Sequence, residues 1–89
     1  MESNNLSYDI VEGLFFVTSF TELTEDLGES PDVIEEELKN LLNKDMIHQM
    51  KFNEQLKDYY QLDTSDYESV RAYHYVASKK GLLKHNERR

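Results

Sequence analysis

The most constraining feature of this chain is a pair of helix-start signals that flank a glycine. Ser19 precedes Glu22 by three positions, the capping-box spacing in which each side chain binds the other residue's backbone amide. Ser30 followed by Pro31 marks a second start, because proline at the first helical position loses no hydrogen bond. Gly28 between them tolerates the left-handed conformation that ends a helix. Two helices joined by a tight turn are therefore predicted.

Apolar residues around this pair recur with helical spacing. Ile34, Leu38, Leu41 and Leu42 fall on one face of the second predicted helix. Residues 6–17 carry a similar stripe and predict a preceding helix, although a glycine inside it weakens that prediction by about 1 kcal/mol. The run at residues 14–17 is also compatible with the chain ending that helix in a short strand.

The second half of the chain reads mainly as strands and a long connection. Residues 46–52 lose the helical period and predict a strand, and residues 71–77, rich in tyrosine and valine, predict another. Residues 53–70 between them are polar and long for a loop, so they are functional, mobile, or contain an extra strand or helical turn. Ser78 can cap a last short helix over residues 79–85. Residues 1–6 and 85–89 are expected to fray.

This order of elements resembles the winged helix-turn-helix domain of bacterial transcription regulators, over about residues 8–83. The segment Ser-Phe-Thr-Glu-Leu-Thr-Glu-Asp-Leu-Gly at 19–28 is similar to their positioning helix and turn. Leu-Lys-Asn-Leu-Leu-Asn-Lys-Asp-Met-Ile at 38–47 is similar to the end of their recognition helix and the first wing strand. Tyr-Val-Ala-Ser-Lys-Lys-Gly at 75–81 is similar to the segment that closes the wing. Asp45 departs from the pattern, since a glycine commonly precedes the first wing strand.

The resemblance implies one α+β domain spanning residues 1–89: a winged helix-turn-helix with a three-helix core and a two-stranded β-wing with a long wing loop. An 89-residue chain is the length of a single domain. It contains no cysteine, which excludes disulfides and thiolate metal sites. It shows no secretory signal and no apolar run that could span a membrane. We therefore expect a cytoplasmic protein with no membrane association.

Charge argues against DNA reading by the second helix of the pair. The net charge of −8 is concentrated in residues 1–50, where twelve acids face two lysines, whereas residues 51–89 carry eight basic residues and six acids. Residues 19–43 alone hold eight acids and one lysine, and the first arginine of the chain is Arg71. DNA affinity comes largely from Lys and Arg contacts to phosphates. The sequence thus disfavours nucleic acid as the partner of this helix.

Two surfaces remain as candidates for binding. Tyr is enriched at protein interfaces, and five of the six tyrosines lie between residues 59 and 75. The candidate contacts for a protein partner or a homodimer are Asp32, Glu35, Glu36, Asn40, Tyr59, Tyr60 and Tyr67. About half of the clustered tyrosines should instead pack the strands onto the helices. A basic C-terminal group provides candidate phosphate contacts or is simply a solvated terminus: Lys79, Lys80, Lys84, Arg88 and Arg89.

The sequence gives little support for a metal site or an enzyme active site. His48 and His74 lie on the two predicted strands and could be cross-strand neighbours, but no ligand spacing accompanies them, so no metal or cofactor is predicted. There is no glycine-rich phosphate loop and no nucleophile elbow, and the capping serines have no nearby histidine. The sequence predicts a non-catalytic regulatory or adaptor module that acts through protein contacts. The alternative is a DNA-binding transcription regulator that uses its wing and basic C-terminal segment.

Overall fold

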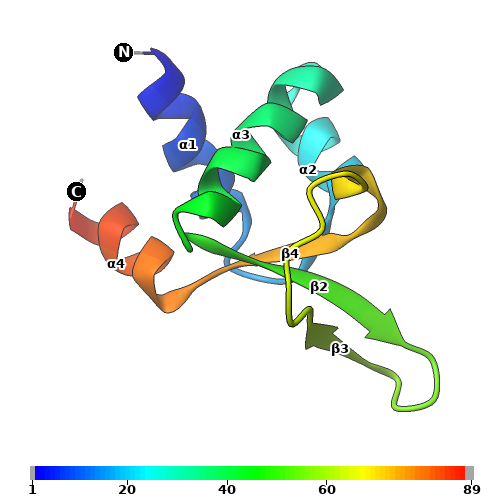
Figure 1. Ribbon diagram of the computed structural model, residues 1–89. Coiled ribbons are helices and arrows are strands. Elements are labelled where there is room, and N and C mark those ends of the chain that lie inside the picture. The colour runs from blue at the N-terminus through cyan, green and yellow to red at the C-terminus, as the bar shows by residue number, and fades with distance from the viewer. Residues whose placement is uncertain (1, 88–89) are drawn as a thin grey trace.

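The computed structural model describes residues 2–87, with side chains from residue 6 onward, and these residues form an α+β fold (Figure 1). The elements are α1 (Glu2–Gly13), β1 (Thr18–Ser19), α2 (Phe20–Leu27), α3 (Pro31–Asn43), β2 (Ile47–Asn53), β3 (Asp58–Gln61), the 3-10 helix η1 (Val70–Ala72), β4 (His74–Ala77) and α4 (Lys79–Glu87). Within residues 2–87, no helix combines the length and apolar character needed to cross a membrane.

The capped pair α2–α3 confirms the strongest sequence signals. The Ser19 hydroxyl accepts a hydrogen bond from the Glu22 amide at 3.1 Å, and the Ser19 amide donates to the Glu22 carboxylate at 3.1 Å. Gly28 has φ 68°, the left-handed conformation expected at the end of α2. The Ser30 hydroxyl accepts from the Asp32 amide at 3.2 Å at the start of α3. Local chemistry therefore determines where both helices begin.

The core lies where α1, α2 and α3 meet one face of the sheet. Helix α1 ends at Gly13 instead of running to residue 17, and the chain then enters the short strand β1. The α3 stripe is buried as predicted, with Leu38 fully inaccessible. The buried apolar residues of the described chain are Ile10, Val11, Leu14, Phe20, Leu23, Ile34, Leu38, Leu41, Leu42, Ile47, Val70, Tyr75 and Ala77.

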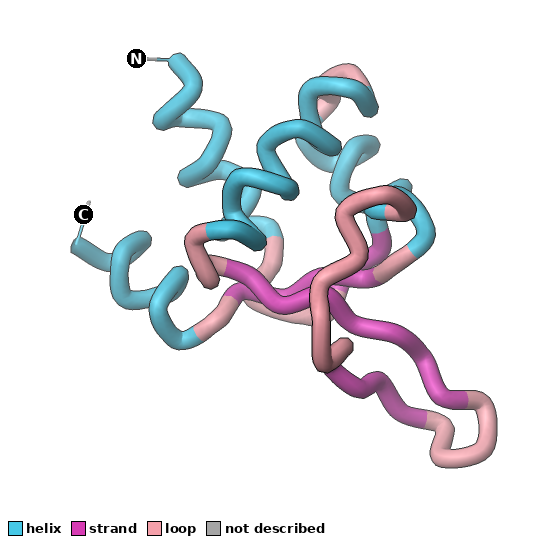
Figure 2. The backbone as a smooth tube through the Cα atoms, in the orientation of Figure 1, coloured by secondary structure: helices cyan, strands magenta, loops and turns pink. Residues whose placement is uncertain are grey.

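The described strands form one antiparallel sheet with the order β1-β4-β2-β3 (Figure 2). The expectation of a two-stranded sheet was wrong, because β1 and β3 add to the β2–β4 pair. Residues facing the helices alternate with residues facing away, so Gln49 and Tyr75 are buried while Met50 and His74 are only partly covered. The β2–β3 hairpin extends away from the helices (Figure 1).

The long connection holds the extra structure that the sequence analysis left open. Strand β3 pairs with the outer half of β2, and residues 70–72 form η1. The prediction of a strand over residues 71–77 was therefore too long, since β4 begins at His74. Helix covers residues 2–6 and 85–87 as well, stretches that were expected to fray.

Two backbone positions fix how β2 and α4 meet. Asp45 has φ 61°, so this position, at which the winged-helix resemblance led us to expect a glycine, adopts the left-handed conformation. The Asp45 carbonyl accepts a hydrogen bond from the Ser78 hydroxyl at 2.6 Å, just before α4. A side chain at Gly81 would have its Cβ only 2.0 Å from the Met46 carbonyl oxygen. The start of α4 is thus packed directly on the backbone that leads into β2.

Candidate interaction surfaces

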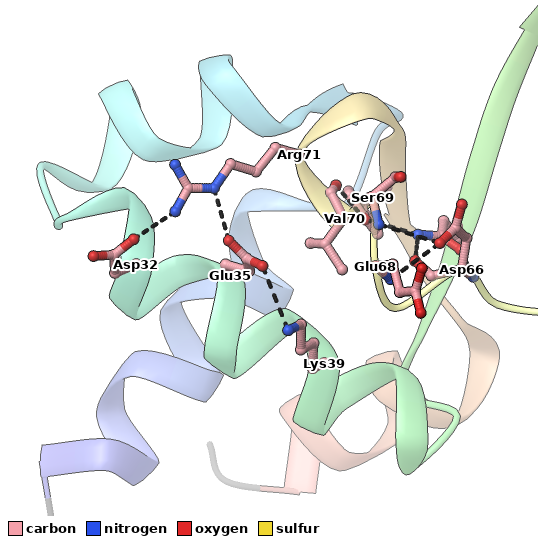
Figure 3. A network of polar contacts seen from close by, with 10 residues as sticks. Asp32, Glu35, Lys39, Asp66, Glu68, Ser69, Val70 and Arg71 are labelled. Atoms are coloured by element: carbon pink, nitrogen blue, oxygen red, sulfur yellow. Dashed lines mark hydrogen bonds and ion pairs between the residues drawn. The ribbon is translucent and has the colours of Figure 1, made fainter.

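The exposed face of α3 is occupied by an arginine from the distant 3-10 helix η1 (Figure 3). The Arg71 guanidinium donates from Nη2 to Asp32 Oδ1 at 2.5 Å and from Nε to Glu35 Oε1 at 2.7 Å. Lys39 adds an ion pair to Glu35, with Nζ 3.4 Å from Oε2. We call these four residues the Arg71 network. It joins the first two turns of α3 to a segment more than thirty positions later in the chain.

Electrostatics in the Arg71 network favours the charged forms of Glu35 and Arg71. The hydrogen bond from Arg71 is the main cause that lowers the pKa of Glu35 below its ordinary value, and Lys39 lowers it further. The same contacts with Glu35 and Asp32 raise the pKa of Arg71. The Arg71 guanidinium also lies 5.5 Å from the centre of the Phe20 ring, a cation–π distance. The guanidinium therefore lies between the first residue of α2 and the first turns of α3.

Asp66 shapes the segment that presents Arg71. Its Oδ1 accepts hydrogen bonds from the amides of Glu68 at 3.0 Å and Ser69 at 3.1 Å, which folds the chain into a turn before η1 (Figure 3). Its Oδ2 accepts from the Tyr73 hydroxyl at 2.9 Å. That hydrogen bond is the main cause that lowers the pKa of Asp66 and raises the pKa of Tyr73. One carboxylate thus holds both sides of η1.

A buried polar group ties this turn to the sheet. The Gln49 side chain donates from Nε2 to the Asp66 carbonyl at 3.0 Å and accepts from the Asp66 amide at 2.7 Å, like a backbone strand partner. The Tyr75 hydroxyl lies 3.0 Å from Gln49 Nε2 and donates to the Val70 carbonyl at 2.6 Å. Burial raises the pKa of Tyr75 to about 12. Gln49 and Tyr75 therefore position the residues on either side of the turn.

The acidic residues of the Arg71 network were predicted as contact residues from the sequence, whereas Arg71 and the turn that presents it were not. Asp32 and Glu35 are brought together by Arg71, whereas Glu36 and Asn40 are exposed farther along α3. A weak signal for the turn was present, because Ser65 and Asp66 are residue types that favour turns. No local signal pairs Arg71 with α3, since that contact depends on the path of the whole connection.

A second surface lies on the sheet face that points away from the core. The Phe52 and Tyr59 rings, directly opposite in the β2–β3 register, pack edge to face at 5.1 Å between centroids. Tyr59 also contacts the His74 ring at 4.9 Å. We call these three residues the aromatic sheet face. Phe52 is 37% exposed and Tyr59 36% exposed, and Leu56 at the hairpin tip is 75% exposed. These exposed fractions leave apolar ring area accessible on this face.

The other clustered tyrosines divide between packing and exposure. Tyr75 is fully buried and Tyr73 packs against the core, as expected for about half of the group. Tyr60 follows Tyr59 on β3, so its side chain points to the opposite face of the strand. Tyr67 is exposed in the turn before η1. The three predicted tyrosine contacts therefore do not form one patch.

The basic C-terminal group lies on α4. Lys79 and Lys80 are exposed at the start of this helix. Lys84 is exposed as well, and its Nζ lies 3.7 Å from Glu87 Oε1. Arg88 and Arg89 lie outside the described residues. The described part of this group is thus a row of three solvated lysines, one of which has an acidic neighbour.

The structure does not place the two strand histidines opposite each other. His48 pairs with Val76 and His74 pairs with Met50, so the histidines are offset by two positions. Within residues 6–87, no group of three potential metal-ligating side chains comes together. Ser19 and Ser30, the most conspicuous serines of the sequence, are used as helix caps.

Comparison with protein-family models, curated proteins and solved structures gave no match to this chain.

Proposed function

We propose that this chain is a non-catalytic regulatory or adaptor module of the winged helix-turn-helix type that acts by binding another protein. The order of a capped helix pair followed by a β-hairpin supports that architecture. In such domains the helix corresponding to α3 enters the major groove and its N-terminal residues contact bases. Function then depends on whether the first turns of α3 are available.

The observation that carries the proposal is that Arg71 is hydrogen-bonded across the first two turns of α3 (Figure 3). Duplex DNA docked there would have to displace η1 or face the carboxylates of Asp32 and Glu35 without their cation. The neighbouring acids Glu25, Asp26, Glu29 and Glu36 are exposed and repel phosphates as well. The Arg71 contacts and the exposed carboxylates thus act in the same direction against DNA.

Protein binding is supported by the aromatic sheet face. Phe52 and Tyr59 present rigid apolar rings, and aromatic residues of this kind act as anchors in protein interfaces. The acidic surface of α2 and α3 adds a preference for basic partners, because complementary charge speeds association and disfavours wrong partners. The partner we propose is therefore a protein, or a second copy of the chain, that offers an apolar patch beside basic residues.

The DNA arm of the test is an anisotropy titration of labelled random-sequence duplex at low salt. We expect no saturable binding by the wild-type chain. Binding that weakens steeply with salt, and that is lost in a Lys79→Ala/Lys80→Ala variant, would instead establish the DNA-contacting alternative.

The protein arm compares the wild-type chain with a Phe52→Ser/Tyr59→Ser variant. Sedimentation over a range of concentrations measures self-association, and affinity capture followed by titration of the purified partner measures hetero-association. We expect the double variant to weaken the association at least about tenfold, as loss of two anchors does. Leu83→Ser, which changes an exposed apolar residue on α4, is the matched control and should leave it unchanged. Equal losses in the two variants would rule out the aromatic sheet face as the binding surface.

A further inference from the structure

A cavity of about 360 Å³ lies between α1, the C-terminal end of α3 and α4. This is the end of the molecule opposite the β2–β3 hairpin (Figure 1). Its apolar wall is formed by Val11, Leu41 and Met46, and its polar rim includes Lys44 and Lys84. We call it the α1–α4 cavity. Its volume falls at the small end of the range typical of small-molecule sites.

His85 lines this cavity and carries a polar group with no partner. The residue is only 4% exposed, and neither Nδ1 nor Nε2 has a hydrogen bond to any described residue. Its ring stacks on Tyr8 at 4.1 Å between centroids and meets the edge of Phe15 at 5.5 Å. A buried donor or acceptor left unpaired costs about 1–3 kcal/mol. The arrangement is therefore unfavourable for packing alone, and a phenylalanine would fill the same space without that cost.

The charges around the cavity favour a monoanion. Lys44 and Lys84 contribute two positive charges, and Glu87, which also lines the cavity, lies beside Lys84. The lining therefore carries one net positive charge. Across the α1–α3 contact, the Ser7 hydroxyl donates to Glu37, which places one more carboxylate near this end of the molecule. A phosphate dianion would be only partly balanced here, and the apolar wall would give it no contact.

We propose that the α1–α4 cavity binds a small organic carboxylate with an apolar body. The carboxylate accepts a hydrogen bond from the His85 imidazole and an ion pair from Lys44, while the hydrocarbon part packs on Val11, Leu41 and Met46. Binding requires the His85 ring to turn one nitrogen toward the cavity it already lines. Such a site would make the module responsive to a metabolite. This site is separate from the surfaces of the protein-binding proposal, because none of its residues belongs to the Arg71 network or to the aromatic sheet face.

The test is a titration of the full chain with hexanoate, followed by ¹H–¹⁵N NMR. Hexanamide is the uncharged control of the same shape, and inorganic phosphate is the control for any anion. We expect saturable shifts at Ser7, Val11, Leu41 and Lys44 with hexanoate alone. His85→Phe keeps the stacked ring and removes both nitrogens, and Lys44→Met removes the cation; each should weaken hexanoate binding by about tenfold.

Lys80→Met is the matched control, since Lys80 is an exposed lysine of α4 that does not line the cavity, and it should bind hexanoate like the wild type. The proposal is overturned if hexanoate produces no saturable shifts in the wild-type chain. It is also overturned if phosphate or hexanamide binds equally well, or if His85→Phe binds hexanoate as tightly as the wild type. Because these readouts are local to the cavity, their failure would leave the DNA and protein titrations unaffected.

Discussion

Two regions on the same side of the molecule are held in place by different physics. The α2–α3 pair is defined by residues close in sequence: the Ser19 and Ser30 caps, the Gly28 stop and the α3 stripe. Residues 62–73 run beside α2 and α3 and contain no apolar periodicity, yet they are fixed by contacts to Gln49, Asp32 and Glu35. The first region is determined by its own sequence, and the second by residues that reach it from elsewhere in the fold.

This difference matters for function because the second region contacts the first through Arg71. The local signals alone would leave the first turns of α3 free. Here the later segment places Arg71 over the start of that helix. The surface at the start of α3 therefore carries ion pairs with Arg71 in place of free carboxylates. Removing local and non-local interactions separately tests this contrast between the two regions.

The largest effect is expected from the local region. Leu38→Ala removes a fully buried side chain from the α3 stripe and should lower the free energy of unfolding by about 2–5 kcal/mol. Val33→Ala, at an exposed position of the same helix, should change it by no more than about 0.5 kcal/mol. Urea unfolding measures both. If the two variants were equally stable, α3 would not pack through the face described here.

A somewhat smaller loss is expected from the non-local region. Gln49→Ala leaves the Asp66 amide, the Asp66 carbonyl and the Tyr75 hydroxyl without their amide partner. We expect about 2–3 kcal/mol of destabilisation, because buried groups lose their hydrogen bonds. Gln61→Ala, on the exposed strand β3, is the control. Hydrogen exchange at Asp66 should accelerate in Gln49→Ala alone, and unchanged exchange there would show that Gln49 does not hold the turn.

Capping gives the smallest of these effects and separates the two regions most cleanly. Ser30→Ala should cost about 1 kcal/mol, since the Asp32 amide loses its acceptor. Ser69 precedes η1 but makes no side-chain cap hydrogen bond, so Ser69→Ala should be nearly silent. Chemical denaturation of the two variants side by side provides the measurement. A larger loss of stability for Ser69→Ala than for Ser30→Ala would contradict the assignment of the side-chain cap to Ser30.

The same difference between local and non-local interactions explains which parts of the structure could be predicted from the sequence. Caps and periodic leucines act within a few residues, so the bounds of α2 and α3 followed from the sequence. The four-stranded sheet did not, because β1 is two residues long and every residue of β3 is exposed, which leaves little apolar pattern to detect. The Arg71 network was also out of reach, since charge composition shows how many acids α3 carries but not which distant cation neutralises them. His85 looked like a residue of a fraying terminus, and only the packing of α4 shows it as buried.

The central claim is that Arg71 occupies the start of α3, and the most direct measurement is the titration of the Glu35 carboxylate by ¹³C NMR. The guanidinium lowers the pKa of Glu35, so its stabilising contribution is complete above the ordinary value of 4.5 and is lost as the pH falls through the lowered one. We predict that Glu35 titrates below 4.5 in the wild-type chain and moves back toward 4.5 in Arg71→Met, whereas Lys80→Met changes nothing. A Glu35 carboxylate that titrates at its ordinary value in the wild-type chain, and does not respond to Arg71→Met, would contradict this account and show that Arg71 does not occupy the start of α3.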